Sequence, residues 1–272
     1  MWSRLIAIER ADDPRIADFR DIRERDLTGR QNRLIAEGTV VLRMLVEASR
    51  SGSFATEKVL LLRNRVDGVA PILERLPGDV PIYVAEAEVL DRIVGFHLHR
   101  GVLALGRREV AEFDLIDRLP ERSLVLVGCG ISNHDNAGSM FRNAAAFKAD
   151  AVFLDETSCD PLYRKALRVS VGSVLSVPYE RKGTALDVLT RLSANGFSIW
   201  TLSPRGETDI RAIPPTERMA LVVGTEGEGL PPAVLEGFQS ARIPQSEGLD
   251  SLNVATATGI ALFAMSSAAN LI

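Results

Sequence analysis

The sequence has few of the residues that build several common kinds of functional site. Its 272 residues include two cysteines, Cys129 and Cys159, and three histidines. Two cysteines make neither a disulfide framework nor a CxxC metal site, so we expect a reduced, cytoplasmic setting and predict no metal site. The chain also lacks the GxxxxGK(S/T) phosphate loop, the GxGxxG dinucleotide fingerprint and the GxSxG elbow. These absences count against a nucleotide-binding oxidoreductase or a hydrolase.

An excess of charge of either sign is also missing. The formal net charge is −4, which argues against one large basic patch. Arginine greatly outnumbers lysine, which suits bidentate contact with phosphate but is also explained by compositional bias. The opening residues 1–13 contain no long apolar run and no small-residue cleavage site, so no export signal is expected.

Charged side chains are absent from residues 251–272, where the sequence predicts the final helix. This stretch has the length of a membrane span, but serine, threonine and asparagine interrupt it throughout and Gly259 lies midway. A helix that is small or apolar on every side, yet too polar for lipid, is best buried by protein on more than one face. We therefore expect a subunit interface and no membrane partner; the alternative is the central helix of a monomer core.

Between residues 121 and 272, short β-branched runs alternate with helical stretches. The predicted strands are 124–128, 151–154, 173–179, 198–203, 220–225 and 241–245, and the predicted helices lie around 138–148, 161–169, 184–195 and 231–237. Such alternation predicts an α/β domain with a mostly parallel sheet covered on both faces. Ligands of such sheets bind beyond the carboxyl ends of the strands, so the loops there form the candidate site.

The first 107 residues predict a small α/β domain of their own. The pattern predicts an amphipathic helix over 33–49, a second helix over 86–95, and strands over 58–64, 80–85 and 101–108. Residues 108–120 then form a polar linker to the domain over 121–272.

The loop after the predicted strand 124–128 leads into a helix with a candidate anion ligand. Asp135 or Asn136 is placed to cap this helix. Gly138 and Arg142 are four residues apart and share a helical face, and long helical side chains point back toward the helix N-terminus. Arg142 is therefore expected to reach over Gly138 to the strand ends, as a ligand for a phosphate or a developing negative charge. The alternative is an ordinary surface salt bridge.

Two further loops have unusual compositions. In "GTEGEGLPP" (224–232), closely spaced glycines permit positive φ and let a ligand approach the backbone, and Glu226 is held in the turn. In the loop that enters the final helix, Pro244 stiffens the exit from a strand, Ser251 is the predicted N-cap, and Asn253 lies one turn inside.

Taken in order, these loops resemble the motifs of a known family. N-x-G-x-x-x-R at 136–142, "VVGTEGEGL" at 222–230 and "IPQSEGLDSLNVATATGIAL" at 243–262 are similar to the three ordered motifs of the SpoU/TrmH family of RNA ribose 2′-O-methyltransferases, in the SPOUT superfamily. The segment "LYRKALRVSVGSV" (162–174) is similar to a further stretch common in that family. Residues 1–107 more loosely resemble the L30e-like RNA-binding domain that often precedes the catalytic domain.

The resemblance implies a catalytic domain with a deep trefoil knot, S-adenosylmethionine as the cofactor and RNA as the substrate, with ribosomal RNA favoured over transfer RNA. It also implies a homodimer in which Arg142 of one subunit completes a site built on the other. By position, the cofactor-binding residues are Gly224, Thr225, Gly229, Ile243 and Leu252, and the catalytic residues are Asn136, Arg142, Glu226, Ser251 and Asn253.

The chain departs from the family pattern at one point. Asn133 and His134 precede Asp135, where many members have Asp-Pro. His134 invites a general-base interpretation, and an exposed loop histidine is the alternative. Two other functions stay open: methylation of transfer RNA, and a catalytically silent RNA-binding or ribosome-assembly factor with the same fold.

Overall fold

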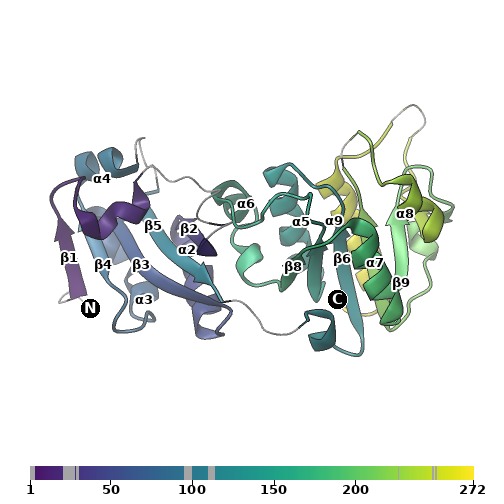
Figure 1. Ribbon diagram of the computed structural model, residues 1–272, viewed down its shortest axis with the longest axis horizontal. Coiled ribbons are helices and arrows are strands. Elements are labelled where there is room, and N and C mark those ends of the chain that lie inside the picture. The colour runs from purple at the N-terminus through teal and green to yellow at the C-terminus, as the bar shows by residue number, and fades with distance from the viewer. Residues whose placement is uncertain are drawn as a thin grey trace. The chain divides into compact units, whose positions relative to one another are not determined.

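The chain forms two compact units, each with its own sheet and core (Figure 1). This computed structural model describes residues 4–20, 28, 31–94, 100–109, 114–225, 227–246, 248 and 250–272. The first unit comprises residues 1–111 together with 162–175, and the second comprises 112–161 and 176–272. The sequence did not indicate that 162–175 would group with the first unit, and the domain limits drawn from it stay predictions.

The first unit contains a five-stranded mixed sheet with the order β1-β4-β3-β5-β2. Its strands are β1 (Leu5–Ile8), β2 (Arg33–Glu37), β3 (Phe54–Leu62), β4 (Ile82–Ala85) and β5 (Val102–Arg108). β1, β4 and β3 run parallel, whereas β5 runs antiparallel to both β3 and β2. A register shift between Thr56 and Lys58 interrupts the pairing of β3 with β5.

Helices and short 3₁₀ segments complete the first unit. The helices are α2 (Thr39–Arg50), α3 (Val66–Leu73), α4 (Ala87–Val94) and α6 (Arg164–Val169), and the 3₁₀ segments are η2 (Pro14–Phe19), η3 (Arg63–Arg65) and η5 (Ser173–Leu175). Phe19, Ile35 and Leu60 belong to one buried cluster. Within this unit α6 contacts β2, and η5 contacts α2.

The predicted helix over 33–49 is wrong in its opening residues. Leu34 and Ile35 are buried in β2, which pairs with β5, and α2 begins only at Thr39. Gly38 separates the two elements with φ 91°, a conformation that L side chains rarely adopt. The other elements predicted in this part correspond to β3, β4, α4 and β5, whereas β1 was not predicted.

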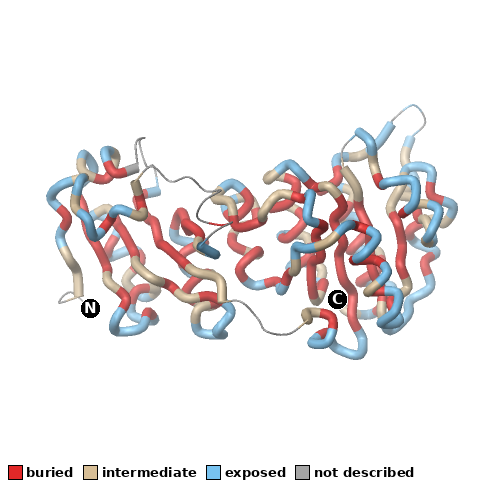
Figure 2. The backbone as a smooth tube through the Cα atoms, in the orientation of Figure 1, coloured by how far each residue is buried: buried red, intermediate tan, exposed pale blue. Residues whose placement is uncertain are grey.

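The second unit contains a seven-stranded sheet with the order β10-β12-β9-β11-β6-β7-β8. Its strands are β6 (Ser123–Gly128), β7 (Ala151–Leu154), β8 (Tyr179–Arg181), β9 (Ser198–Leu202), β10 (Thr208–Asp209), β11 (Arg218–Val223) and β12 (Gln239–Arg242). The described pairs are all parallel, which confirms the predicted sheet type. β6, β7 and β11 are buried along almost their whole length (Figure 2), as expected when both faces are covered.

Helices cover both faces of this sheet. They are α5 (His134–Ala146), α7 (Ala185–Ala194), α8 (Pro232–Gly237) and α9 (Val254–Ala268), with 3₁₀ segments η4 (Ile116–Arg118) and η6 (Ile210–Ala212). α7 and α8 pack in one cluster with Val125 and Val127 of β6. Side chains alternate along a strand, so Gly128 faces the other side, where a Cβ added to it would lie 3.0 Å from the Met140 side chain of α5.

The final helix α9 packs beside α5 and contacts β11 (Figure 1). Ser266 Oγ donates to the Phe147 carbonyl oxygen at 2.8 Å, and the Phe263 and Phe147 rings meet edge to face at 5.8 Å. Ile260 and Phe263 of α9 are nevertheless 41% and 55% exposed. In the described part of the chain, no helix combines the length and apolar character that a membrane span requires.

Three local predictions in this unit are corrected. The strand predicted over 173–179 is the 3₁₀ segment η5 followed by β8, which starts only after Pro178 because proline has no N–H to donate to a strand. The N-cap of α5 is Asn133, whose Oδ1 accepts from Asp135 N at 2.8 Å, and not Asp135 or Asn136. The N-cap of α9 is Asn253 and not Ser251. The short strand β10 was not predicted, and the trefoil knot and the L30e-like character of residues 1–107 stay predictions.

Candidate active site

The three loops singled out in the sequence follow β6, β11 and β12, at one edge of the parallel sheet. β11 lies between β9 and β6, so the ends of these neighbouring strands are close in space. Cys129 N donates to the Val223 carbonyl oxygen at 2.9 Å and joins the first residue after β6 to the last residue of β11. Parallel pairing therefore delivers segments that are distant in sequence to the same place.

The first loop is held by the segment that follows β7. Gly130 adopts φ 66°, and its N–H donates to both carboxylate oxygens of Asp155 at 3.0 Å. Ile131 N donates to Ser158 Oγ at 3.0 Å, and Cys159 N donates to the Ile131 carbonyl oxygen at 2.8 Å. The N–H groups of Gly130 and Ile131 and the carbonyl oxygen of Ile131 thus fix the turn.

The second loop closes into a tight turn. Thr225 and Gly229 exchange backbone hydrogen bonds of 3.2 Å in both directions. A Cβ added at Gly224 would lie 2.5 Å from backbone atoms of Gly229, so only glycine fits there. A Cβ added at Gly130 would lie 2.7 Å from Thr225 Cγ2, so the first and second loops are in direct contact.

The third loop meets the first through two asparagines. Asn253 Oδ1 accepts from Ala255 N at 3.0 Å and Thr256 N at 3.2 Å, and so caps α9. Its Nδ2 donates to Asn136 Oδ1 at 3.0 Å. Asn136 is buried in the first turn of α5, so this bond fixes the entrance of α9 against the start of α5.

Arg142 lies on α5, one turn beyond Gly138, and is exposed. Among the residues that the structure describes, its guanidinium has no ion pair or hydrogen bond, so the surface salt bridge considered as an alternative is not formed within them. His134 is the first residue of α5 and is partly exposed; its general-base interpretation stays a prediction.

The remaining predicted site residues belong to the second and third loops. Ser251 is exposed, and Ile243 and Leu252 are partly exposed. The prediction for Glu226 lies outside the described residues. The structure therefore brings together Asn136 and Asn253, and separately Gly224, Thr225 and Gly229, while the roles assigned to all of them stay predictions.

A family model for SpoU rRNA methylases matches residues 123–263. The chain belongs to the SpoU rRNA methylase family. The match covers the parallel sheet and the three loops, so it confirms the resemblance seen in the motifs.

Relatives with functional names support the membership. An uncharacterized tRNA/rRNA methyltransferase of Mycobacterium bovis is 40% identical, over 93% of this chain and 88% of its own length. A 23S rRNA (guanosine-2′-O-)-methyltransferase of Haemophilus ducreyi is 30% identical, over 76% of this chain and 87% of its own length. The Escherichia coli protein with the same activity in its name is also 30% identical, over 76% of this chain and 88% of its own length.

Solved structures share the fold over nearly the whole chain. The AdoMet-bound rRNA methyltransferase of Sinorhizobium meliloti superposes with a TM-score of 0.79, at 23% identity, over 97% of this chain and 98% of its own. The SpoU methyltransferase AviRb of Streptomyces viridochromogenes, in complex with AdoMet, gives 0.78 at 19% identity, over 93% and 95%. At these identities the likeness establishes the SPOUT α/β fold of this SpoU family member.

Sequence reasoning missed the pair Asp155 and Ser158, which are 6% and 1% exposed. A signal was present, because Asp155 directly follows the predicted strand 151–154 and so had to lie at the site's edge of the sheet. Burial, and then the charge of Asp155, raises the pKa of the Cys129 thiol to about 12. Cys129 is therefore a protonated, buried thiol at neutral pH and not a nucleophile.

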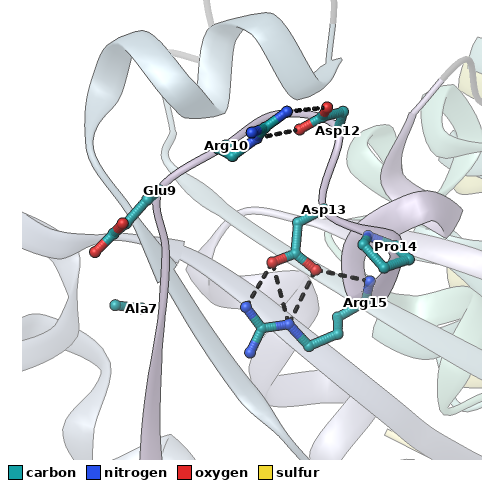
Figure 3. A pocket seen from close by; sticks show the side chains of 7 residues that line it. All are labelled: Ala7, Glu9, Arg10, Asp12, Asp13, Pro14 and Arg15. Carbon is teal, nitrogen blue, oxygen red and sulfur yellow. Dashed lines mark hydrogen bonds and ion pairs between the residues drawn. The ribbon is translucent and has the colours of Figure 1, made fainter.

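The first unit has a hollow of about 550 Å³ lined by residues between Ala7 and Arg15, most of them in the segment that joins β1 to η2 (Figure 3). Its arginines are already paired, Arg10 with Asp12 at 2.7 Å and Arg15 with Asp13 at 2.5 Å. Hydrogen bonding from Arg15 lowers the pKa of Asp13 to about 2. These pairs engage both arginines of the hollow, and none of the family's motif residues lines it, so we do not assign the active site to it.

Proposed function

We propose that this protein transfers a methyl group from S-adenosylmethionine to the 2′-hydroxyl of a ribose in RNA. The observation that carries the proposal is the hydrogen bond from Asn253 to Asn136, which joins the third loop to the helix bearing Arg142. The contact of Gly130 with Thr225 adds the second loop to the same cluster. Three separate motifs of the family thus meet in one place.

The second loop suits a cofactor held by backbone atoms. Among the described residues, a Cβ added at Gly227 or Gly229 would meet no atom within 4 Å, so these leave the backbone of the turn open to a ligand. When bound, S-adenosylmethionine supplies an electrophilic methyl group. We assign Gly224, Thr225, Gly229, Ile243 and Leu252 to holding it.

The remaining site residues would act on the RNA. A ribose hydroxyl is a poor nucleophile, and holding it in line with the donor is expected to supply several kcal/mol of the reduction in barrier, up to about 7–11 kcal/mol in well-oriented systems. Arg142 has an exposed, cationic side chain, suited to binding the adjacent phosphate and stabilising the emerging alkoxide. Its guanidinium does not lose a proton at accessible pH, so we assign it an electrostatic role and not that of a base.

Asn136 and Asn253 orient one another and, in our proposal, the hydroxyl. The bond between them leaves the Asn136 amide nitrogen available as a donor, and Ser251 lies exposed two residues before Asn253. Glu226 and Ser251 are proposed to complete this polar cluster around the ribose. Recognition of a 2′-hydroxyl commits the enzyme to RNA over DNA.

We infer ribosomal RNA as the substrate. The names of the Haemophilus and Escherichia relatives specify 23S rRNA, whereas the mycobacterial name leaves both tRNA and rRNA open. Transfer RNA is therefore the second candidate, and residues 1–107 are proposed to bind the RNA. We expect the protein to act in the cytoplasm, where both kinds of RNA are found.

A homodimer is proposed to cover α9. Ile260 and Phe263 lie about one turn apart and are 41% and 55% exposed, on a helix that has no charged residue. Large apolar side chains grouped on one helix face are typical of interfaces. In this dimer Arg142 of one subunit would enter the site of the other, which agrees with its lack of a partner among the described residues of its own chain.

The decisive experiment incubates the protein with labelled S-adenosylmethionine and total RNA from a strain that lacks the gene. We expect label in ribosomal RNA and, after mapping, on one ribose 2′-oxygen. Label in the transfer RNA fraction alone would select the second candidate. Cofactor binding without transfer to any RNA would favour the silent factor.

Replacement of Arg142 tests its assigned role. We expect Arg142→Ala to lower the transfer rate by at least about a hundredfold, as for loss of one transition-state donor, while the affinity for the cofactor stays within about twofold. Arg211→Ala is the matched control, because Arg211 is an exposed arginine of the same unit, paired with Asp209. Parallel loss of transfer and cofactor affinity in Arg142→Ala would show that the role is misassigned.

A further inference from the structure

Asp155 is a buried carboxylate at the carboxyl end of β7. It is 6% exposed and accepts hydrogen bonds from Gly130 N, from Ser158 N at 2.9 Å, from Ser158 Oγ at 2.6 Å and from Thr157 Oγ1 at 2.9 Å. Within the described residues no lysine or arginine pairs with it. Its hydrogen bonds therefore come from neutral donors within these residues. The three donor residues belong to two segments at the site's edge: Gly130 follows β6, whereas Thr157 and Ser158 follow β7.

Asp155 binds the N–H of Gly130, and Ser158 binds the N–H of the next residue, Ile131. Its hydroxyl hydrogen is directed to Asp155, and its oxygen accepts from Ile131 N at 3.0 Å. The backbone N–H groups of Gly130 and Ile131 thus both end on the Asp155 and Ser158 pair. Neither side chain is among the motif residues assigned to the cofactor or to the RNA.

The position of the turn controls both neighbouring parts of the site. Gly130 lies against Thr225 of the second loop, with room for no further atom between them. Two residues beyond Ile131, Asn133 caps α5, the helix that presents Asn136 to Asn253. A shift of the turn would therefore move the start of α5 relative to the second loop.

We propose that Asp155 and Ser158 are positioning residues for methyl transfer, holding the Gly130 and Ile131 turn so that the cofactor turn 224–229 and the start of α5 keep their spacing. This inference rests on the proposed function. A misplacement of about 1 Å at a reacting centre lowers a rate by about a hundredfold. Holding this turn rigidly therefore gives a reason for burying the Asp155 carboxylate.

The same two strands provide a matched control at their other end. Asp150 directly precedes β7, and its carboxylate accepts from Leu124 N at the start of β6 at 2.9 Å. Asp155 directly follows β7 and accepts from Gly130 N just beyond the end of β6. Asp150→Asn and Asp155→Asn therefore disturb the same kind of bond between the same strands, but only the second lies at the site.

The first measurement is hydrogen exchange of the Gly130 and Ile131 amides in the full chain without cofactor. We expect Asp155→Asn to speed exchange at Gly130, and Ser158→Ala to speed it at Ile131, each at least tenfold, whereas Asp150→Asn leaves both within twofold. Unchanged exchange in both variants would overturn the proposed hold on the turn.

The second measurement is the affinity for S-adenosylmethionine by calorimetry, together with the transfer rate at saturating cofactor and RNA. We expect Asp155→Asn and Ser158→Ala to weaken affinity or slow saturated transfer at least tenfold at a temperature where each variant is fully folded. A purely structural role would lower the melting temperature of all three variants and leave both quantities within twofold, and that result would overturn the proposal.

The two hypotheses fail in different ways. If the unaltered protein binds no S-adenosylmethionine, the proposed function falls, while the exchange measurement still decides whether Asp155 and Ser158 hold the turn. If Asp155→Asn does not fold, Ser158→Ala carries both measurements, since it keeps the carboxylate and removes one hydroxyl, which accepts from Ile131 N and donates to Asp155. Unchanged exchange, affinity and transfer in Ser158→Ala would then count against the proposal.

Discussion

The two edges of the seven-stranded sheet satisfy their backbone groups in different ways. At the amino edge a long side chain covers carbonyl oxygens: Arg218 donates to the carbonyl oxygens of Asn195 at 3.0 Å and Glu121 at 3.4 Å, and its guanidinium lies 5.2 Å from the Phe197 ring centre. At the carboxyl edge, short side chains and glycine backbone pack directly against each other, as between Gly224 and Gly229. A long side chain such as Arg218 can rotate to make room for an added atom, whereas the backbone of Gly229 beside Gly224 cannot.

The difference supports our proposal that the site lies at the carboxyl edge. At the amino edge, Arg218 occupies backbone carbonyl oxygens with its long side chain. Glycine turns hold one another in place and still expose backbone to a ligand, as at Gly227 and Gly229. The compact edge should therefore respond sharply to the addition of a single methyl group.

The largest effect is expected for Gly224→Ala. The new Cβ would lie 2.5 Å from the Gly229 backbone, which cannot rotate away as a side chain can. We expect a loss of about 1–3 kcal/mol in the free energy of unfolding and an opened turn that binds S-adenosylmethionine at least about tenfold more weakly. Denaturant unfolding and calorimetry measure these two quantities.

Gly237→Ala is the control for that substitution, because no atom of the part of the chain that the structure describes lies within 4 Å of its added Cβ. Its change in stability should stay within about 0.5 kcal/mol. If Gly224→Ala also changed the free energy of unfolding by less than about 0.5 kcal/mol, the proposed difference in packing between the two edges would be wrong.

An intermediate effect is expected at Asn253, which has two separable tasks. Asn253→Ala removes both the cap of α9 and the donor to Asn136, and should cost about 1 kcal/mol of stability as well as activity. Asn253→Ser restores a capping oxygen but not the bond to Asn136. We expect serine to recover stability and leave transfer impaired; recovery of both would mean that the bond between the loops is not needed.

The smallest effect concerns pH and Cys129. Burial raises the pKa of this thiol from 9.0 to about 12, so its contribution to stability is complete below about pH 9 and is lost as the pH rises toward 12. Between neutral pH and about pH 10, the free energy of unfolding should fall by about 1 kcal/mol more in the unaltered protein than in Cys129→Ala. Denaturant unfolding of both proteins at both pH values measures the two decreases. Equal decreases would contradict the assigned burial of the thiol.

Much of the second unit could be predicted from the sequence, because buried parallel strands are continuous apolar runs with clear limits. The strands 124–128 and 151–154 match β6 and β7 closely. The run 33–49 misled because its apolar residues fit a helical period on both sides of Gly38, and only pairing with β5 makes the first part a strand. Pro178 likewise delays β8 to Tyr179, the last residue of the strand predicted over 173–179.

At the site, the motifs identified the loops but not their internal bonds. Asn136 and Asn253 could be named from spacing, yet their direct hydrogen bond depends on how two helices begin. The caps were misplaced because Asn133 and Asn253 compete with neighbouring polar residues that a sequence pattern cannot separate. Asp155 could be placed at this edge from its position after a predicted strand, but the bonds that Asp155 and Ser158 accept from Gly130 N and Ile131 N are seen only in the folded chain.

The bond between Asn253 and Asn136 joins two primary amides, neither of which gains or loses a proton in the range where enzymes work. The bond that joins the third loop to α5 is therefore independent of pH in that range, unlike a bond made by an ion pair or a histidine. A pH dependence of methyl transfer would then arise from other groups, and not from the loss of this bond.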